Sequence, residues 1–290
     1  MPNQFAEMDT WTSEQVALFK EQAKSKMMDQ LQAGTFLMGA EAGPGTLLAE
    51  GDSWFDYLPG TDIIDCLRNN HDYVIDNHAK AGDTLENMIY GTDINRRFER
   101  VSPTIDRVLW QLGKLKPRVF LFSGGGNDVA GEEFESYLNH KNSGLTIIRE
   151  EFVDQMINEV FKKYFEDLIE KVVTVSPQTN IIVHGYGRTV PTGEGVDFLF
   201  FNFAGPWLRP ALAKKGIFDQ AEQRRAVFTV IDKYNTMLNE LSRHHNRFHH
   251  VDLRDMIDPD SDWANELHLR NSAYARVALK IHEVIQALQA

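Results

Sequence analysis

Five short apolar segments alternate with longer segments of helical periodicity along most of this 290-residue chain. The apolar segments are TLLAEG (46–51), DYVIDNHA (72–79), RVFLFSGGG (118–126), NIIVHGYG (180–187) and RFHHVDL (247–253). Apolar residues at helical spacing mark the segments at 102–115, 150–173, 219–245 and 270–290. Short buried strands that alternate with helices form βαβ units, which build a mostly parallel sheet covered on both faces. The pattern therefore predicts an α/β fold in a single domain over residues 46–290.

The first 45 residues lie outside this pattern. Thr12 followed by Gln15 resembles a capping box, and apolar residues then recur at helical spacing as far as Leu31. A Gly- and Pro-rich connector follows at 40–46. We expect residues 1–45 to be a helical extension and linker. An extra helix packed on the domain and an arm for a partner subunit in an oligomer both agree with this segment.

Composition narrows the classes of function. Thirty Lys and Arg against 42 Asp and Glu give a net charge of −12, which disfavours binding to nucleic acid or to anionic lipid surfaces. The single cysteine, Cys66, excludes an intrachain disulfide and CxxC metal sites, and we expect it to be a buried apolar residue. No apolar run is long enough for a membrane helix, and the N-terminal sequence lacks signal-peptide features. We therefore expect a cytoplasmic protein.

Polar residues stand where the predicted strands end, at the edge of a parallel α/β sheet that binds ligands. Ser53 ends a Gly-Asp-Ser block after the first strand, Gly82 follows the second, and Asn127 lies in a Gly-Gly-Asn-Asp block after the third. His184 ends the fourth strand, and His268 precedes the last helix. Each has an ordinary structural explanation, such as a turn or a helix cap. Their order and shared location instead indicate a catalytic site.

This constellation resembles the SGNH (GDSL-type) hydrolase family, over residues 46–290 in block order. In that family the Gly-Asp-Ser block provides a nucleophile, which corresponds to Ser53. The backbone N–H groups of Ser53 and Gly82 and the side-chain amide of Asn127 correspond to the oxyanion hole, and His268 to the general base. The resemblance implies a three-layer αβα sandwich with a five-stranded parallel sheet, and it implies no cofactor and no metal.

The implied activity is hydrolysis of a carboxylic ester through an acyl group on Ser53. A lipid ester, a small acyl ester and an O-acetylated sugar all agree with the resemblance. Acyl transfer to an alcohol other than water, on the same scaffold, is an alternative that the sequence does not separate from hydrolysis. A binding module with a weakened site is a further alternative.

The chain departs from the family pattern three residues before His268, where Asn265 replaces the usual Asp. The third member of a Ser-His-Asp triad orients the imidazole and stabilises the imidazolium. Asn265 could accept the N–H of His268 through its carbonyl oxygen, as in Cys-His-Asn sites. Glu266 or Asp262 could supply a carboxylate instead, or the site could have lost activity. The sequence leaves these three readings open.

Three other features carry weaker expectations. His184 is either a substrate contact or a hydrogen-bonded structural residue. The histidines 244, 245, 249 and 250 invite a metal interpretation, but no HExxH-type motif accompanies them. The segment 188–216 is predicted to be a long irregular loop, and its aromatic part, 198–207, could form a lid or the wall of an apolar acyl pocket.

Overall fold

The computed structural model describes residues 46–57, 60–198 and 201–288, with the backbone alone over 197–198 and 201–203. The predicted N-terminal helix and linker, and with them the proposed oligomer contact, lie outside the described residues. No helix in the described part is both long and apolar enough to span a membrane.

A five-stranded parallel sheet forms the centre of the molecule, as the alternating pattern predicts. Its strands, in spatial order, are β2 (Val74–Asn77), β1 (Thr46–Glu50), β3 (Val119–Phe122), β4 (Asn180–His184) and β7 (Phe248–Val251). Each lies within one of the five apolar segments of the sequence. The chain order reverses between β1 and β3, and such a switch point is where parallel α/β sheets place their ligands.

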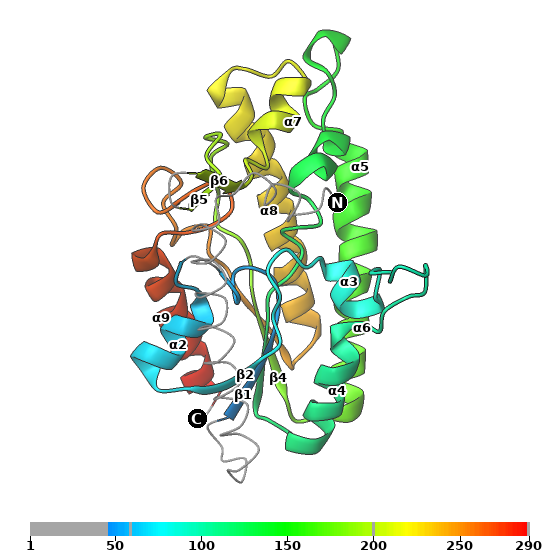
Figure 1. Ribbon diagram of the computed structural model, residues 1–290, viewed down its shortest axis with the longest axis vertical. Helices are drawn as coiled ribbons and strands as arrows, with labels where there is room; N and C mark the ends of the chain where they lie inside the picture. Colours follow the sequence, from blue (N-terminus) through cyan, green and yellow to red (C-terminus); the bar gives the residue numbers. More distant parts are fainter. Residues whose placement is uncertain (1–45, 58–59, 199–200, 289–290) are drawn as a thin grey trace.

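Helices cover both faces of the sheet (Figure 1). One face carries α2 (Ile63–His71) and α9 (Asn271–Ala287); the other carries α3 (Leu85–Tyr90), α4 (Thr104–Leu115), α6 (Lys162–Val175) and α8 (Gln220–His244). Strand β3 shows why its sequence is apolar throughout. Leu121 packs in the cluster with α2 and α9, whereas Phe120 and Phe122 pack in the cluster with α4, α6 and α8. The predicted three-layer αβα sandwich is confirmed.

The helical segment predicted at 150–173 is continuous but not uniform. It consists of α5 (Glu150–Gln155), a π-helical stretch η4 (Met156–Phe161) and α6. Shorter 3₁₀ segments, η2 (Gly131–Tyr137) and η3 (Lys141–Ser143), connect β3 to this element. A π-helical turn contains more residues than an α-helical turn. Residues four apart along this element therefore stay on one face, and the residues of this face that are buried are Val153, Ile157, Phe161 and Phe165.

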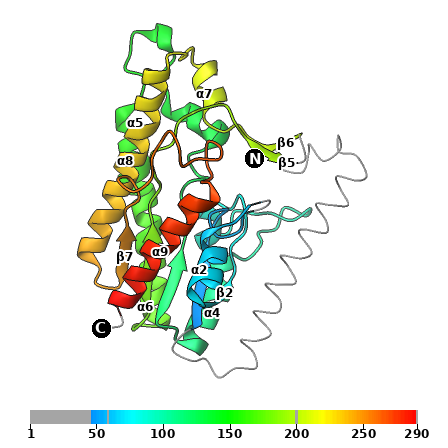
Figure 2. The ribbon, with the colours of Figure 1, turned by 90° about the vertical axis from the view of Figure 1, so that its left-hand side faces the viewer.

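The prediction of an irregular segment at 188–216 is wrong for much of its length. Its backbone forms an antiparallel hairpin of β5 (Val196–Phe198) and β6 (Phe201–Ala204), followed by α7 (Arg209–Lys214). The hairpin is a separate two-stranded sheet that projects away from the central sheet (Figure 2). The sequence gives little sign of this hairpin because its strands are only three and four residues long, and because the two residues between them are not the Gly or Asn pair that marks hairpins.

Candidate active site

Ser53 lies in the turn directly after β1, the strand beside the switch point. The turn is closed by the Asp52 carboxylate, which accepts the backbone N–H of Trp54 at 2.9 Å. Helix α2 begins only at Ile63 and is capped by Asp62, so Ser53 is not a helix-capping residue. Its side chain lines a pocket instead.

His268 meets Ser53 from the far end of the chain. Its Nε2 lies 2.8 Å from the Ser53 Oγ, and the ring of Tyr57 stacks on the imidazole with 4.1 Å between centroids. The side chain is almost fully buried, and burial lowers the pKa of His268 to about 3. The imidazole is therefore neutral over the physiological pH range and free to accept a proton.

Asn265 orients this imidazole. Its Oδ1 lies 3.1 Å from Nδ1 of His268 and also accepts the backbone N–H groups of Leu267 and His268, at 3.0 and 2.9 Å. Two backbone donors fix which end of the amide is the oxygen, so Nδ1 of His268 must carry the hydrogen. The other nitrogen, Nε2, then has its lone pair directed at Ser53. Asn265 thus sets the tautomer that a general base requires.

The carboxylate of Glu266 is hydrogen-bonded to a different part of the protein. Its carboxylate accepts four backbone N–H groups, from Gly193, Trp207, Leu208 and Arg209, at 2.6–3.1 Å. Burial raises the pKa of Glu266, and the four N–H groups oppose that shift. The carboxylate therefore ties the segment before α7 to the loop that carries His268. Since its oxygens face this segment, Glu266 is a poor source of charge for the imidazole.

Asp262 is also occupied. Its carboxylate accepts the backbone N–H of Asp258 at 2.7 Å and forms an ion pair with Arg276 on α9. Within the described part of the chain, neither Asp262 nor Glu266 hydrogen-bonds to His268. Of the three readings of this block, the geometry favours Asn265 as the orienting residue.

Replacing Glu266 with Gln should destabilise the protein more than it changes the chemistry. The Gln amide would retain one oxygen for the four backbone donors, and each buried donor left without a partner costs about 1–3 kcal/mol. We expect chemical denaturation to show a loss of about 2–4 kcal/mol in the free energy of unfolding, with kcat falling less than tenfold. Glu151→Gln, at an exposed position of α5, is the matched control. If Glu266→Gln is as stable as the wild type but its kcat falls by much more than tenfold, Glu266 would again be a candidate for the third member of the triad.

Gly82 and Asn127 lie together near Ser53. Gly82 occupies a turn with φ of +79°, and the Asn127 amide donates one hydrogen to the carbonyl of the adjacent Asp83 at 2.9 Å. Asn127 and Ser53 line the same pocket, and the second amide hydrogen of Asn127 remains for a ligand. Among the described residues, none accepts the backbone N–H of Ser53 or of Gly82. The structure thus leaves the N–H groups of Ser53 and Gly82 without an acceptor among the described residues, and one hydrogen of the Asn127 amide free in the pocket.

A buried polar network lies beneath the turn that carries Ser53. Asp52 accepts the hydroxyl groups of Ser123, at 2.7 Å, and of Tyr186, at 2.6 Å. The Ser123 Oγ is in turn 2.8 Å from Nε2 of His184, whose Nδ1 contacts the carbonyl of Gly185 at 2.7 Å. These contacts join the ends of β1, β3 and β4. No sequence motif marked Ser123 or Tyr186 for this role.

His184 itself is only 1% exposed and stacks under Trp54, with 4.9 Å between ring centroids. Burial lowers the pKa of His184. The structure therefore places His184 in the interior and not at the rim of the pocket, because the bulky ring of Trp54 covers it. Of the two expectations for this residue, its position fits the structural one.

The histidines 244, 249 and 250 each contact a different group of the protein. His249 contacts the Asn180 side chain at 3.1 Å, His250 contacts Asn235 at 3.2 Å, and His244 bonds a carbonyl of its own helix. Over the described residues, no group of three or more His, Cys, Asp or Glu side chains has a geometry that could hold a metal ion. Cys66 is buried on α2, and burial raises the pKa of its thiol to about 11.

Comparison with known proteins extends these findings. No protein-family model matches the chain, and no curated protein matches its sequence. Among solved structures, an extracellular lipase from Streptomyces rimosus superposes with a TM-score of 0.50 at 12% identity, covering 82% of this chain and 98% of the lipase. A family 3 carbohydrate esterase from Clostridium thermocellum gives 0.46 at 14% identity, with 84% and 96% covered. The likeness to the lipase confirms the SGNH-type fold.

Proposed function

We propose that this protein is a serine esterase that hydrolyses carboxylic esters through an acyl group on Ser53. The observation that carries the proposal is the line of contacts from Ser53 Oγ through His268 to Asn265, at the edge of a pocket that also exposes Asn127. A serine hydroxyl is a weak nucleophile unless a base adjoins it. Here the base is neutral, correctly tautomeric and within hydrogen-bonding distance.

Acylation begins when Ser53 Oγ attacks the ester carbonyl carbon and its proton passes to Nε2 of His268. The oxyanion that forms accepts hydrogen bonds from the N–H groups of Ser53 and Gly82 and from the Asn127 amide. The ester C–O bond then breaks, and His268 returns the proton to the departing alkoxide, which leaves as the alcohol. The product is an acyl ester of Ser53.

Deacylation repeats these steps with water. His268 takes a proton from water, the resulting hydroxide attacks the acyl carbon, and the bond to Ser53 Oγ breaks as Oγ recovers the proton. The carboxylic acid is released and the enzyme returns to its starting state. An acceptor alcohol in the place of water would make the same site an acyltransferase, and product analysis with added glycerol separates the two reactions.

The proposal is tested by covalent labelling. An alkyl fluorophosphonate transfers its phosphonyl group to an activated serine with loss of fluoride, and we expect mass spectrometry to locate the adduct on the peptide that contains Ser53. Heat-denatured protein is the control, since it lacks the base beside the serine. An adduct at another serine would contradict the proposed function. The absence of any adduct would also contradict it if the folded protein does not hydrolyse p-nitrophenyl butyrate.

A further inference from the structure

The pocket beside Ser53 has walls of apolar side chains. The space open to the centre of a water-sized sphere is about 80 Å³. One water needs about 10–15 Å³ on this measure, so the pocket has room for several waters or a short methylene chain. One wall is the face of α8 that carries Val227, Val230 and Ile231, and residues after β3, including Ala130 and Phe134, form another part of the lining. A cavity of this kind stabilises methylene groups far better than hydroxyl groups.

The polar side chains in the wall are already engaged within the protein. Tyr186 donates its hydroxyl to Asp52, and Tyr234 donates to the carbonyl of Gly124. The indole N–H of Trp54 binds the Leu267 carbonyl, that of Trp263 binds the Arg188 carbonyl, and Thr189 binds the Glu266 carbonyl. The carboxylate of Glu266 already accepts four backbone N–H groups. Among the described lining residues, Ser53 and Asn127 are left with polar groups for a ligand.

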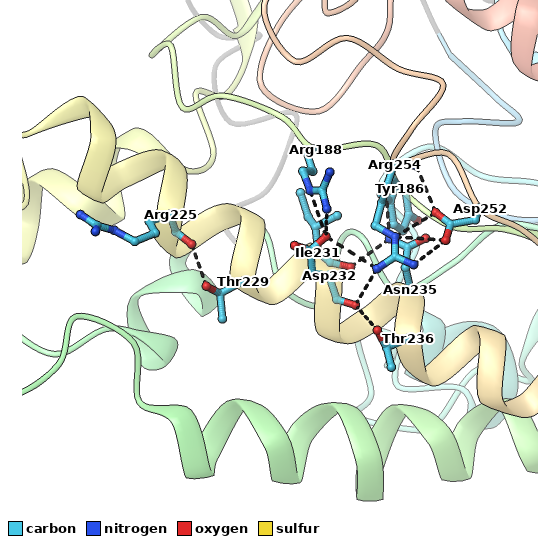
Figure 3. Close-up of polar contacts among 10 residues, drawn as sticks. All are labelled: Tyr186, Arg188, Arg225, Thr229, Ile231, Asp232, Asn235, Thr236, Asp252 and Arg254. Carbon is cyan, nitrogen blue, oxygen red and sulfur yellow. Dashed lines mark hydrogen bonds and ion pairs between the residues drawn. The ribbon is translucent and has the colours of Figure 1, made fainter.

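The α8 wall is held firmly against the segment that follows β4 (Figure 3). Asp232 on α8 accepts the guanidinium of Arg188 at 2.9–3.0 Å, and Arg254 bridges Asp232 to Asp252. Asn235, one turn further along α8, donates to the carbonyl of Tyr186 at 3.0 Å. These contacts fix the helix against the segment after β4, so its apolar side chains at the pocket stand as a preformed wall.

From these observations we infer that the pocket binds the acyl chain of the ester, and that the preferred substrates carry an unbranched apolar acyl group longer than acetyl. This inference rests on the proposed function and specifies its substrate class. The acyl carbonyl lies between Ser53 and Asn127, and the methylene chain runs along Val227, Val230 and Ile231. The alcohol part of the ester leaves through the open mouth.

The inference separates this chain from esterases that act on acetylated sugars. In an acetylated sugar the group that enters the pocket is acetyl, which buries no methylene against these walls, whereas the sugar, as the alcohol part, lies at the mouth. Most of the aliphatic lining comes from α8 and from the segment after β3, and Thr189 and Leu208 of the segment 188–216 also line the pocket.

The first test is a series of p-nitrophenyl esters from acetate to dodecanoate, with an O-acetylated xylooligosaccharide alongside. Each buried methylene contributes about a fourfold gain in kcat/KM, so we expect hexanoate, with four more methylenes, to exceed acetate by about 250-fold and the acetylated sugar to be the poorest substrate. A profile that peaks at acetate, or at the acetylated sugar, would overturn the inference while leaving the esterase proposal intact.

Substitutions in the wall test where the chain lies. We expect Val230→Phe to lower kcat/KM for octanoate at least tenfold more than it lowers kcat/KM for acetate. Thr236→Phe, at an exposed position of the same helix, is the matched control. If Val230→Phe does not fold, Val129→Phe at the half-buried edge of the pocket serves instead. An equal fall for both esters, or none, contradicts the assignment of this wall.

Binding without turnover distinguishes the two proposals. Titration calorimetry with Ser53→Ala should show octanoate binding at least tenfold tighter than acetate, with no detectable binding of xylobiose. If Ser53→Ala binds octanoate but the wild type hydrolyses no ester, the result would support the acyl-chain pocket and contradict the proposed esterase activity. If the wild type hydrolyses esters but Ser53→Ala binds octanoate and acetate equally well, the result would support the esterase and contradict the acyl-chain pocket.

Discussion

Ser53→Ala is expected to lower kcat for p-nitrophenyl butyrate by about 10⁴–10⁶-fold, the loss found when the nucleophile of a triad is removed. The methyl group that replaces the hydroxymethyl leaves His268 in place but offers no oxygen for the acyl group. The loss of turnover in Ser53→Ala is measured by the release of p-nitrophenol. The variant should also show no labelling by the fluorophosphonate. The residual rate would come from the three oxyanion donors and from binding alone.

Ser143→Ala, in an exposed turn of η3, provides the control for the loss of a serine hydroxyl. It should match the wild type in both assays. If Ser53→Ala retained more than about one-tenth of the wild-type kcat, acyl transfer to Ser53 would be ruled out, and water activated directly by His268 would replace it.

Replacing Asn265 should have the next largest effect. We expect Asn265→Leu to lower kcat by about 10³–10⁴-fold, since nothing would then fix the hydrogen of His268 on Nδ1. Asn265→Asp should keep the tautomer and add a negative charge beside the ring, which raises the pKa of His268 by about 1–3 units. The imidazolium formed in the transition state is then better stabilised, and kcat at neutral pH should rise by roughly tenfold.

The pH profile of kcat/KM distinguishes this explanation from a purely structural one. The active form of His268 is deprotonated, so activity falls as the pH falls through its pKa. With a pKa of about 3, the wild type should keep its activity well below pH 5, and Asn265→Asp should lose activity at a higher pH. Identical acid limits in the two proteins would show that residue 265 does not act through the charge on the imidazole.

The sequence predicts most of the framework because burial on both faces leaves a local signature. Each strand of the sheet lies inside an apolar run, and the residues directly after β1 and β3 include Ser53 and Asn127. Gly82 and His268 follow from block order. These parts of the site depend on short segments of chain whose position in the sheet is set by the strands themselves.

The identity of the residue that orients His268 does not follow from the sequence. Glu266 stands two residues from His268, yet its carboxylate is taken by backbone groups near α7, about 60 residues away along the chain. Whether a carboxylate is free depends on where a distant segment folds back. The stacking of Tyr57 on His268 was missed for the same reason, since it arises from a tertiary contact without a local motif.

The contacts of Asp52 also have a consequence for the rigidity of the site. Its carboxylate accepts the N–H of Trp54, in the turn that carries Ser53, and the hydroxyl groups of Ser123, directly after β3, and of Tyr186, after β4. A shift of any one of these strand ends relative to the others would break a hydrogen bond within this network, and a buried polar group left without a partner costs about 1–3 kcal/mol. The position of Ser53 is therefore tied to three strands of the sheet and not to β1 alone.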